Sequence, residues 1–258
     1  MLELEQIAAF YPEPIRAFKK NILREYLQYK ILDLVFESKY GGRFAFMGGT
    51  SIRIVCGSNR FSEDLDFDNL GISEPEFEEL SDIIKRNLSL EGYVIEMRNV
   101  YKQAYHCHIN ILNVLYESGI SSYRSEKLKV HLDCEPQGVS YQPDKIILNK
   151  FDVFTRITAV PERILLSQKI FAILNRKRTL GRDIFDAIFL FGRTAPDLDY
   201  LKLKAKISTQ HELKRQLLKK CDALDFARLT KDLEPFLINP RDSKKILLFR
   251  EFVSNLKL

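Results

Sequence analysis

Apolar residues recur at helical spacing in two long regions of the chain. In the first region they are Ile15, Phe18, Ile22, Tyr26, Tyr29 and Leu32. This period predicts one helix over residues 14–37. From Pro161 onward the helical period returns and continues almost to the end of the chain. The second region therefore predicts an all-helical C-terminal part.

The residues between these regions follow the pattern of a sheet. Short apolar or alternating stretches predict strands at residues 43–47, 64–67, 93–97, 104–112 and 128–133. Two helices are expected among the strands. One spans residues 50–56, and the other begins at a capping box that starts with Ser73 and runs to about Leu88. The fold class is therefore α+β, a mixed sheet with flanking helices followed by the all-helical part.

These two parts differ in charge. Residues 1–159, expected to form one domain, contain 19 Lys and Arg against 23 Asp and Glu. Residues 160–258, expected to form a helical domain that completes the active site, contain 21 against 12. An acidic domain can hold metal ions and a basic one can hold a polyanion. The alternative is that both surfaces are merely solvated.

Composition and length exclude several classes of protein. With 258 residues, 45% of them hydrophobic and 29% charged, the chain can bury a sizeable core. No apolar run approaches the roughly 18 residues of a membrane span. We also expect no signal peptide, because the first residues lack a charged segment followed by an apolar one. The four cysteines form no CxxC pair, which favours reduced thiols and a cytoplasmic location.

Glycines and hydroxyl residues separate the first expected strand from the helix that follows it. Gly48 and Gly49 allow the backbone to pass close to a ligand, and the free amides at a helix start attract phosphate. Thr50 and Ser51 follow with hydroxyls that can form hydrogen bonds. This turn is therefore suited to the triphosphate of an NTP.

Aspartates alternate with apolar residues in the next strand. Asp64 and Asp66 share one face, because successive side chains of a strand point to opposite faces. Two such carboxylates repel each other unless a cation lies between them, and Mg²⁺, or Mn²⁺ in its place, takes oxygen ligands of this kind. Asp133 can supply the further carboxylate that two-metal phosphoryl transfer needs. The alternatives are a surface edge strand for Asp64 and Asp66, and a strand-end cap for Asp133. Asp68 is expected to be solvated.

These motifs resemble those of a known family. Residues 48–67 read GGTSIRIVCGSNRFSEDLDF, which is similar to the signature of the AbiEii/AbiGii toxin family, a branch of the polymerase-β-like nucleotidyltransferases. The likeness is close over residues 44–68 and returns over 161–190. It implies a polymerase-β-like core and a cytoplasmic prokaryotic toxin of a toxin–antitoxin system, associated with phage defence. The implied partner is a cognate antitoxin protein, or regulation occurs at the RNA level. Some family members transfer nucleotides to tRNA 3′ ends and so block translation.

The resemblance also assigns roles to individual residues. It makes Asp64, Asp66 and Asp133 the metal ligands. Lys169 would contact the nucleotide phosphates, and Asp186 would complete the site.

Several charged residues also allow a purely structural role. Arg60 and Arg182 are further candidates for nucleotide binding. Lys169 can instead extend along an apolar helix face to water. Asp186 can pair with Arg182 one helical turn away. Arg60 can pair with Glu63 in the loop before the acidic strand.

We therefore expect an Mg²⁺-dependent nucleotidyltransferase that uses an NTP and an RNA acceptor, with the tRNA 3′ end as the expected site of transfer. The basic run Arg176–Arg178 is expected to contact the RNA, or else to be a solvated helix end. Transfer to a small-molecule or protein hydroxyl, and nucleotide binding without catalysis, are the alternatives. His106, His108 and His131 raise the option of zinc, although a half-solvated strand explains them more simply.

Overall fold

The computed structural model describes residues 2–256, which divide into two compact units. We call them the sheet unit and the helical unit. The sheet unit comprises the chain up to Ser51, Phe61–Gly138 and Pro143–Val160. The helical unit comprises Ile52–Arg60, Val139–Gln142 and the chain from Pro161 onward. The stretch between the glycine turn and the acidic strand thus belongs to the helical unit.

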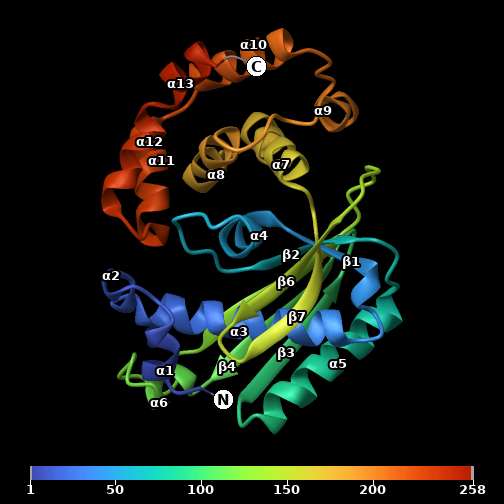
Figure 1. The fold of residues 1–258 in the computed structure, drawn as a ribbon, viewed down its shortest axis with the longest axis vertical. Coiled ribbons are helices and arrows are strands. Elements are labelled where there is room, and N and C mark those ends of the chain that lie inside the picture. Colours follow the sequence, from blue (N-terminus) through green and yellow to red (C-terminus); the bar gives the residue numbers. More distant parts are fainter. Residues whose placement is uncertain (1, 257–258) are drawn as a thin grey trace. The chain divides into compact units, whose positions relative to one another are not determined.

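Seven strands form one mixed sheet, in the order β3-β4-β5-β2-β1-β7-β6 (Figure 1). Their bounds are β1 Phe44–Met47, β2 Leu65–Asn69, β3 Val94–Tyr101, β4 Tyr105–Leu112, β5 Leu128–Glu135, β6 Asp144–Lys150 and β7 Val153–Ala159. β2 pairs with β1 in antiparallel and with β5 in parallel orientation. It therefore lies inside the sheet, with hydrogen-bonded neighbours on both sides.

Two helices of the sheet unit, α3 and α5, pack against one face of the sheet (Figure 1). The helices are α1 Leu4–Ala9, α2 Glu13–Arg16, α3 Lys19–Glu37, the 3₁₀ turn Gly41–Arg43, α5 Glu74–Leu90 and α6 Val114–Glu117. Along a strand, side chains alternate between this packed face and the opposite face. In β5, Val130 and Leu132 are buried, whereas His131 and Asp133, which alternate with them, are part-exposed on the opposite face. One face of the sheet is therefore core, and the other carries polar side chains.

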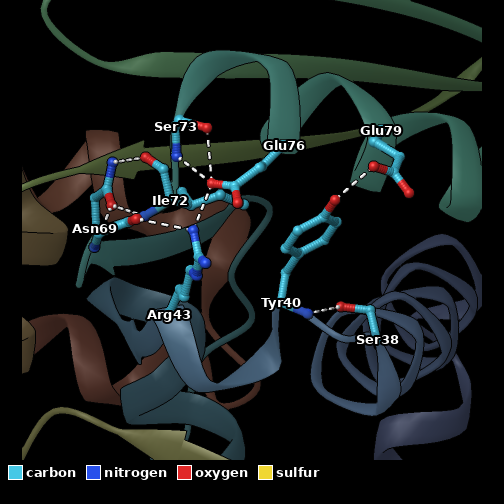
Figure 2. A network of polar contacts seen from close by, with 9 residues as sticks. Ser38, Tyr40, Arg43, Asn69, Ile72, Ser73, Glu76 and Glu79 are labelled. Carbon is cyan, nitrogen blue, oxygen red and sulfur yellow. Dashed lines mark hydrogen bonds and ion pairs between the residues drawn. The ribbon is translucent and has the colours of Figure 1, made fainter.

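A polar network holds the start of α5 next to the entry to β1. The Ser73 amide and hydroxyl both donate to Glu76, at 3.0 and 2.7 Å, which forms the expected capping box. Figure 2 shows that Arg43 and the Asn69 turn join the same network. Tyr40 donates from its hydroxyl to Glu79, one turn further along α5. These contacts fix α5 on the sheet.

The helical unit consists of short helices packed around α7 and α8. The helices are α7 Glu162–Asn175, α8 Gly181–Phe191, α9 Leu198–Ala205, α10 Gln210–Cys221, α11 Phe226–Leu233, α12 Lys244–Leu247 and α13 Phe249–Asn255, with 3₁₀ turns at Glu234–Phe236 and Pro240–Ser243. α4 (Gly48–Ile54) begins in the sheet unit and ends in the helical unit.

The elements confirm the predicted α+β class, with two differences. The helix expected over residues 14–37 is interrupted, because α2 ends at Arg16 and α3 begins only at Lys19, after Phe18 turns away from helical geometry. β6 and β7 were not predicted. Val153 and Ile157 of β7 lie on a buried face, but the apolar Ile147 and Phe154 are 55% and 72% exposed and the polar Thr155 is buried, so the sequence does not alternate clearly between apolar and polar residues.

Candidate active site

The turn from β1 into α4 depends on a glycine. Gly48 has a φ of +77°, in the region that side chains other than glycine rarely adopt. A Cβ atom at this position would also overlap the carboxylate of Asp66. Met47 and Asp66 are partners in the β1–β2 register, which explains this close approach. Gly48 therefore brings the backbone at the start of α4 directly against the acidic strand.

Two of the predicted carboxylates lie side by side on neighbouring strands. Asp66 of β2 and Asp133 of β5 are partners in the parallel register. Asp64, two residues before Asp66, precedes the same strand, and its side chain is 36% exposed, close to the 35% of Asp133. The edge-strand alternative is wrong, because β2 is an interior strand. The strand-end alternative for Asp133 is wrong too, because β5 continues to Glu135.

Histidines contact two of the three carboxylates, Asp133 and Asp64. His106 of β4 is the register partner of Asp133, and its Nδ1 lies 2.7 Å from Asp133 Oδ1. His131 Nδ1 lies 3.3 Å from Asp64 Oδ1. The rings of His108 and His131 meet edge to face, with centroids 4.6 Å apart. Carboxylates and imidazoles therefore lie together across β2, β5 and β4. We call this group the polar row; it consists of Asp64, Asp66, Asp133, His106, His108 and His131.

Asp68 differs from its expected state. It is only 2% exposed, and one of its oxygens accepts a hydrogen bond from the Gln137 backbone N–H at 2.8 Å. The expectation that Asp68 is solvated is therefore wrong. A buried carboxylate needs such partners because burial without them is costly. Asp68 helps to hold the chain after β5 against β2.

Thr50 and Ser51 are both fully buried. The Thr50 hydroxyl donates to the backbone carbonyl of Asp64, so α4 is hydrogen-bonded to the residue that leads into β2. The Ser51 hydroxyl is buried without a hydrogen-bond partner among the described residues. In this structure Thr50 contributes to the site by fixing the backbone of Asp64.

A second charged cluster lies within the helical unit. Arg60 donates to both carboxylate oxygens of Asp186, from Nε and Nη2 at 2.6 Å each, and the two side chains are 1% and 0% exposed. Lys169 Nζ lies 2.9 Å from Asp186 and 3.3 Å from Asp183. Arg176 Nη1 in turn contacts Asp183 at 2.8 Å. We call these five residues the buried charge network.

The network keeps Asp186 ionised. Burial alone would raise the pKa of this carboxyl group, but the charges and hydrogen bonds of Arg60 and Lys169 hold the pKa below its ordinary value. Two cations thus compensate the desolvation of one carboxylate.

Three of the sequence-based alternatives for this cluster are wrong. The partner of Asp186 is Arg60, 126 positions away, and Arg182 lies instead over the ring of Phe236 at 5.6 Å. Glu63 pairs with Arg24 at 3.0 Å. Lys169 does not extend to water, since its side chain is 13% exposed and contacts carboxylates.

The basic run Arg176–Arg178 is less available than the sequence suggests. α7 ends at Asn175, so these residues lie beyond the helix. Arg176 is engaged by Asp183, and Arg178 donates to both oxygens of Asp232 at 2.9 Å. The run is nevertheless exposed and follows directly on α7, so its interpretation as a solvated helix end stands, with two of its cations held in ion pairs.

The family comparison connects these features. A model of the AbiEii family, described as the nucleotidyl transferase AbiEii toxin of type IV toxin–antitoxin systems, matches residues 30–253. The chain belongs to this family. The match includes the glycine turn, the carboxylate row and the buried charge network, so the AbiEii assignment covers both units. No curated protein matches the chain significantly.

Solved structures share the AbiEii chain's fold. JHP933 from Helicobacter pylori is 17% identical with a TM-score of 0.55, over 91% of this chain and 90% of that one. A candidate nucleotidyltransferase from H. pylori is also 17% identical, with a TM-score of 0.52, over 92% of this chain and 98% of that one. These likenesses confirm the expected nucleotidyltransferase fold. Among the helices that the structure describes, none is both long and apolar enough to cross a membrane.

The carboxylates of this AbiEii protein suit Mg²⁺ in donor type. Their oxygens are the ligands that a hard cation prefers, and the absence of a side chain at Gly48 lets the Asp66 carboxylate occupy the volume that a Cβ atom would need. Within residues 2–256, no three His, Cys, Asp or Glu side chains are already arranged around a metal position. Asp133 and Asp64 are engaged by histidines instead. The residues therefore fit the cation chemically.

Sequence reasoning did not link the histidines to the carboxylates. His131 and Asp133 are two residues apart and so share a strand face, which is a visible signal. The pairing of His106 with Asp133 depends on the β4–β5 register, which no local pattern specifies. Arg60 was recognised as a candidate, but its partner was not.

Proposed function

We propose that this AbiEii protein transfers a nucleotide from an NTP to an RNA acceptor, the 3′ end of tRNA, and thereby blocks translation. The observation that carries the proposal is the placement of Asp66 and Asp133 in register, directly beside the Gly48 turn. Carboxylates next to a close backbone approach at a helix start suit a polyphosphate that is bound together with a cation. Membership of the AbiEii family supports nucleotidyl transfer in general and implies an antitoxin as partner.

The reaction is a substitution at the α-phosphorus. The acceptor hydroxyl oxygen forms a bond to this phosphorus, and the bond from phosphorus to the bridging oxygen breaks, which releases pyrophosphate. Asp133 is the proposed acceptor of the hydroxyl proton, since its carboxylate is part-exposed in the row. Mg²⁺, when bound by Asp64, Asp66 and Asp133, supplies positive charge for the phosphate oxygens.

The remaining roles concern positioning. The Gly48–Gly49 turn holds the polyphosphate near the start of α4. Lys169 is the proposed contact for the phosphates, with Arg60 and Arg182 as further candidates. Asp186 is fully buried, so its proposed role is to fix Lys169 and Arg60.

A basic groove in the helical unit supports an RNA acceptor. A cavity of about 720 Å³ lies between the ends of α7 and α9 and one side of α10. Its lining includes Arg215, Lys219 and Lys220, and the last of these donates from Nζ to the Leu174 carbonyl at 3.2 Å. Cations gathered along a groove suit the spaced phosphates of a polynucleotide better than a small acceptor. RNA in the cytoplasm is accordingly the proposed target.

The first experiment tests the reaction itself. The pure protein is incubated with each labelled NTP, Mg²⁺ and total tRNA, and label in the RNA is measured. We expect one or more NTPs to label tRNA, and we expect Asp66→Asn to lose at least about 100-fold in rate because a metal ligand loses its negative charge. Wild-type turnover by Asp66→Asn would refute the mechanism. Label in a small molecule or protein, with none in RNA, would refute the acceptor.

The second experiment tests the groove. Arg215→Glu with Lys219→Glu reverses two exposed cations on one face of α10, and Lys85→Glu with Arg86→Glu is a matched reversal on α5. Phosphate contacts release counterions, so wild-type affinity for tRNA should fall steeply with salt. The α10 variant should bind tRNA weakly and show a smaller salt slope, while the α5 variant should resemble wild type. Equal losses in both variants would contradict a groove-specific contact.

A further inference from the structure

The polar row contains more imidazoles than the proposed reaction uses. Three of the four histidines of the chain lie on the same sheet face as the carboxylates. His106 faces Asp133 across β4 and β5, and His108 faces His131 two residues further along. Asp66 follows on the other side of Asp133. Asp133 therefore has His106 of β4 as a neighbour, and Asp64 has His131 of β5.

The contact between His106 and Asp133 is a hydrogen bond with defined atoms. Nδ1 of the ring lies 2.7 Å from Oδ1, a distance typical of a hydrogen bond to a charged acceptor. An ionised carboxylate only accepts, so Nδ1 carries the proton. The imidazole engages one oxygen and fixes the rotation of the carboxylate, and the second oxygen, Oδ2, is the one that would serve a cation.

The contact between His131 and Asp64 is looser. Nδ1 lies 3.3 Å from Oδ1, and both side chains are more than one-third exposed. The ring of His108 meets His131 edge to face, which restrains the orientation of the His131 ring. The two contacts together flank Asp66, the carboxylate that Gly48 accommodates.

We propose that His106 and His131 are positioning residues, which hold Asp133 and Asp64 so that each presents one oxygen to the metal ion. This inference rests on the proposed function. Groups that hydrogen-bond a metal-ligating residue set its orientation, and their loss typically costs about 10- to 100-fold in metal affinity or activity. His106 has the shorter contact, so its removal should have the larger effect.

Variants of His106 test the inference. His106→Ala removes the donor, whereas His106→Asn retains a side-chain N–H at the same distance from the backbone as Nδ1. Asn110→Ala is the matched control, since this residue lies on the same strand and face as His106 and its register partner on β5 is Lys129 rather than a carboxylate or a histidine. All variants are first compared with wild type by circular dichroism and thermal melting to establish that they fold.

Two readouts are measured on each folded variant. Binding of Mn²⁺ alone is followed by the loss of the electron paramagnetic resonance signal of free Mn²⁺, and transfer to tRNA gives kcat and KM. We expect His106→Ala to weaken Mn²⁺ binding about 10- to 100-fold and to lower kcat with little change in the KM for RNA. His106→Asn should recover most of both, and Asn110→Ala should remain within about threefold of wild type by the same reasoning.

Three results would overturn the inference. The first is wild-type Mn²⁺ affinity and kcat in a folded His106→Ala protein. The second is an equal loss in His106→Asn and His106→Ala, which would indicate that the ring itself is needed. The third is nitrogen hyperfine coupling between bound Mn²⁺ and histidine, which would make the imidazole a ligand. A different result would refute the proposed function alone. If the wild type transfers no nucleotide but binds Mn²⁺, and His106→Ala weakens that binding, the positioning role of His106 stands.

Discussion

The buried charge network allows a quantitative prediction for Asp186→Asn. The substitution preserves the shape of the side chain and removes its charge, which takes away the carboxylate that the Arg60 guanidinium, 1% exposed, contacts at 2.6 Å. Removing one member of a buried ion pair typically costs about 3–5 kcal/mol. Lys169 retains Asp183 at 3.3 Å, so we expect a loss near the lower limit, about 3 kcal/mol in the free energy of unfolding.

An exposed pair provides the control. Arg178 and Asp232 also form an arginine–aspartate pair, in which Nη2 donates to both carboxylate oxygens at 2.9 Å, but the Arg178 side chain is 58% exposed. Water screens such a pair, and Asp232→Asn should cost about 0–1 kcal/mol. The chain contains no tryptophan, so urea unfolding is followed by far-ultraviolet circular dichroism. Hydrogen exchange of peptides from α7 and α8 then localises the effect. Equal destabilisation by the two variants would refute the reasoning.

The difference in unfolding free energy between wild type and Asp186→Asn should depend on pH in a defined way. The pKa of Asp186 is lower in the folded chain than in the unfolded one, because the neighbouring cations outweigh its burial. Its contribution to stability is therefore complete above the ordinary aspartate pKa of about 3.9. It is lost as the pH falls through the folded value. The difference in unfolding free energy between wild type and Asp186→Asn should stay constant from neutral pH to about 5 and shrink only in stronger acid.

Further predictions concern the glycine turn, the thiols and the ligand. Gly48→Ala should abolish nucleotide transfer in the tRNA-labelling assay, since a Cβ atom would displace the Asp66 carboxylate; full activity would contradict that geometry. All four cysteines are free and buried, and burial raises the pKa of Cys107 to about 11. The native chain should therefore resist iodoacetamide at pH 8 and react only when unfolded, as counted by mass spectrometry. Mg²⁺ with the correct NTP should raise the melting temperature by linkage; unchanged melting with all four NTPs would count against nucleotide binding.

Local signals in the sequence were sufficient for much of the sheet unit. The capping box from Ser73 to Glu76 predicts the start of α5 because its hydrogen bonds join residues three positions apart. Asp64 and Asp66 follow from strand alternation in the same way. β6 and β7 escaped prediction because Ile147 and Phe154 are apolar but exposed and Thr155 is polar but buried, which hides the alternation of the two strand faces in the sequence.

Contacts between distant residues could not be predicted. For Asp186 the nearest cation in sequence is Arg182, four positions away, whereas the folded chain pairs it with Arg60 across 126 positions. The pairing of His106 with Asp133 likewise depends on the β4–β5 register. Helical and strand periods specify which face a residue occupies. They do not specify which other element that face meets, and the paired charges of this chain depend on that choice.

The close approach of Gly48 to Asp66 has a consequence for how such chains diverge. The aspartate carboxylate occupies the volume that any side chain at position 48 would need. A substitution at position 48 is therefore tolerated sterically only in a lineage whose residue 66 has already become smaller. The positive φ at position 48 further restricts the replacements to residues such as asparagine. Among descendants of a common ancestor, the two positions should change together, and a chain that has lost this glycine should be read as one that has abandoned the acidic strand.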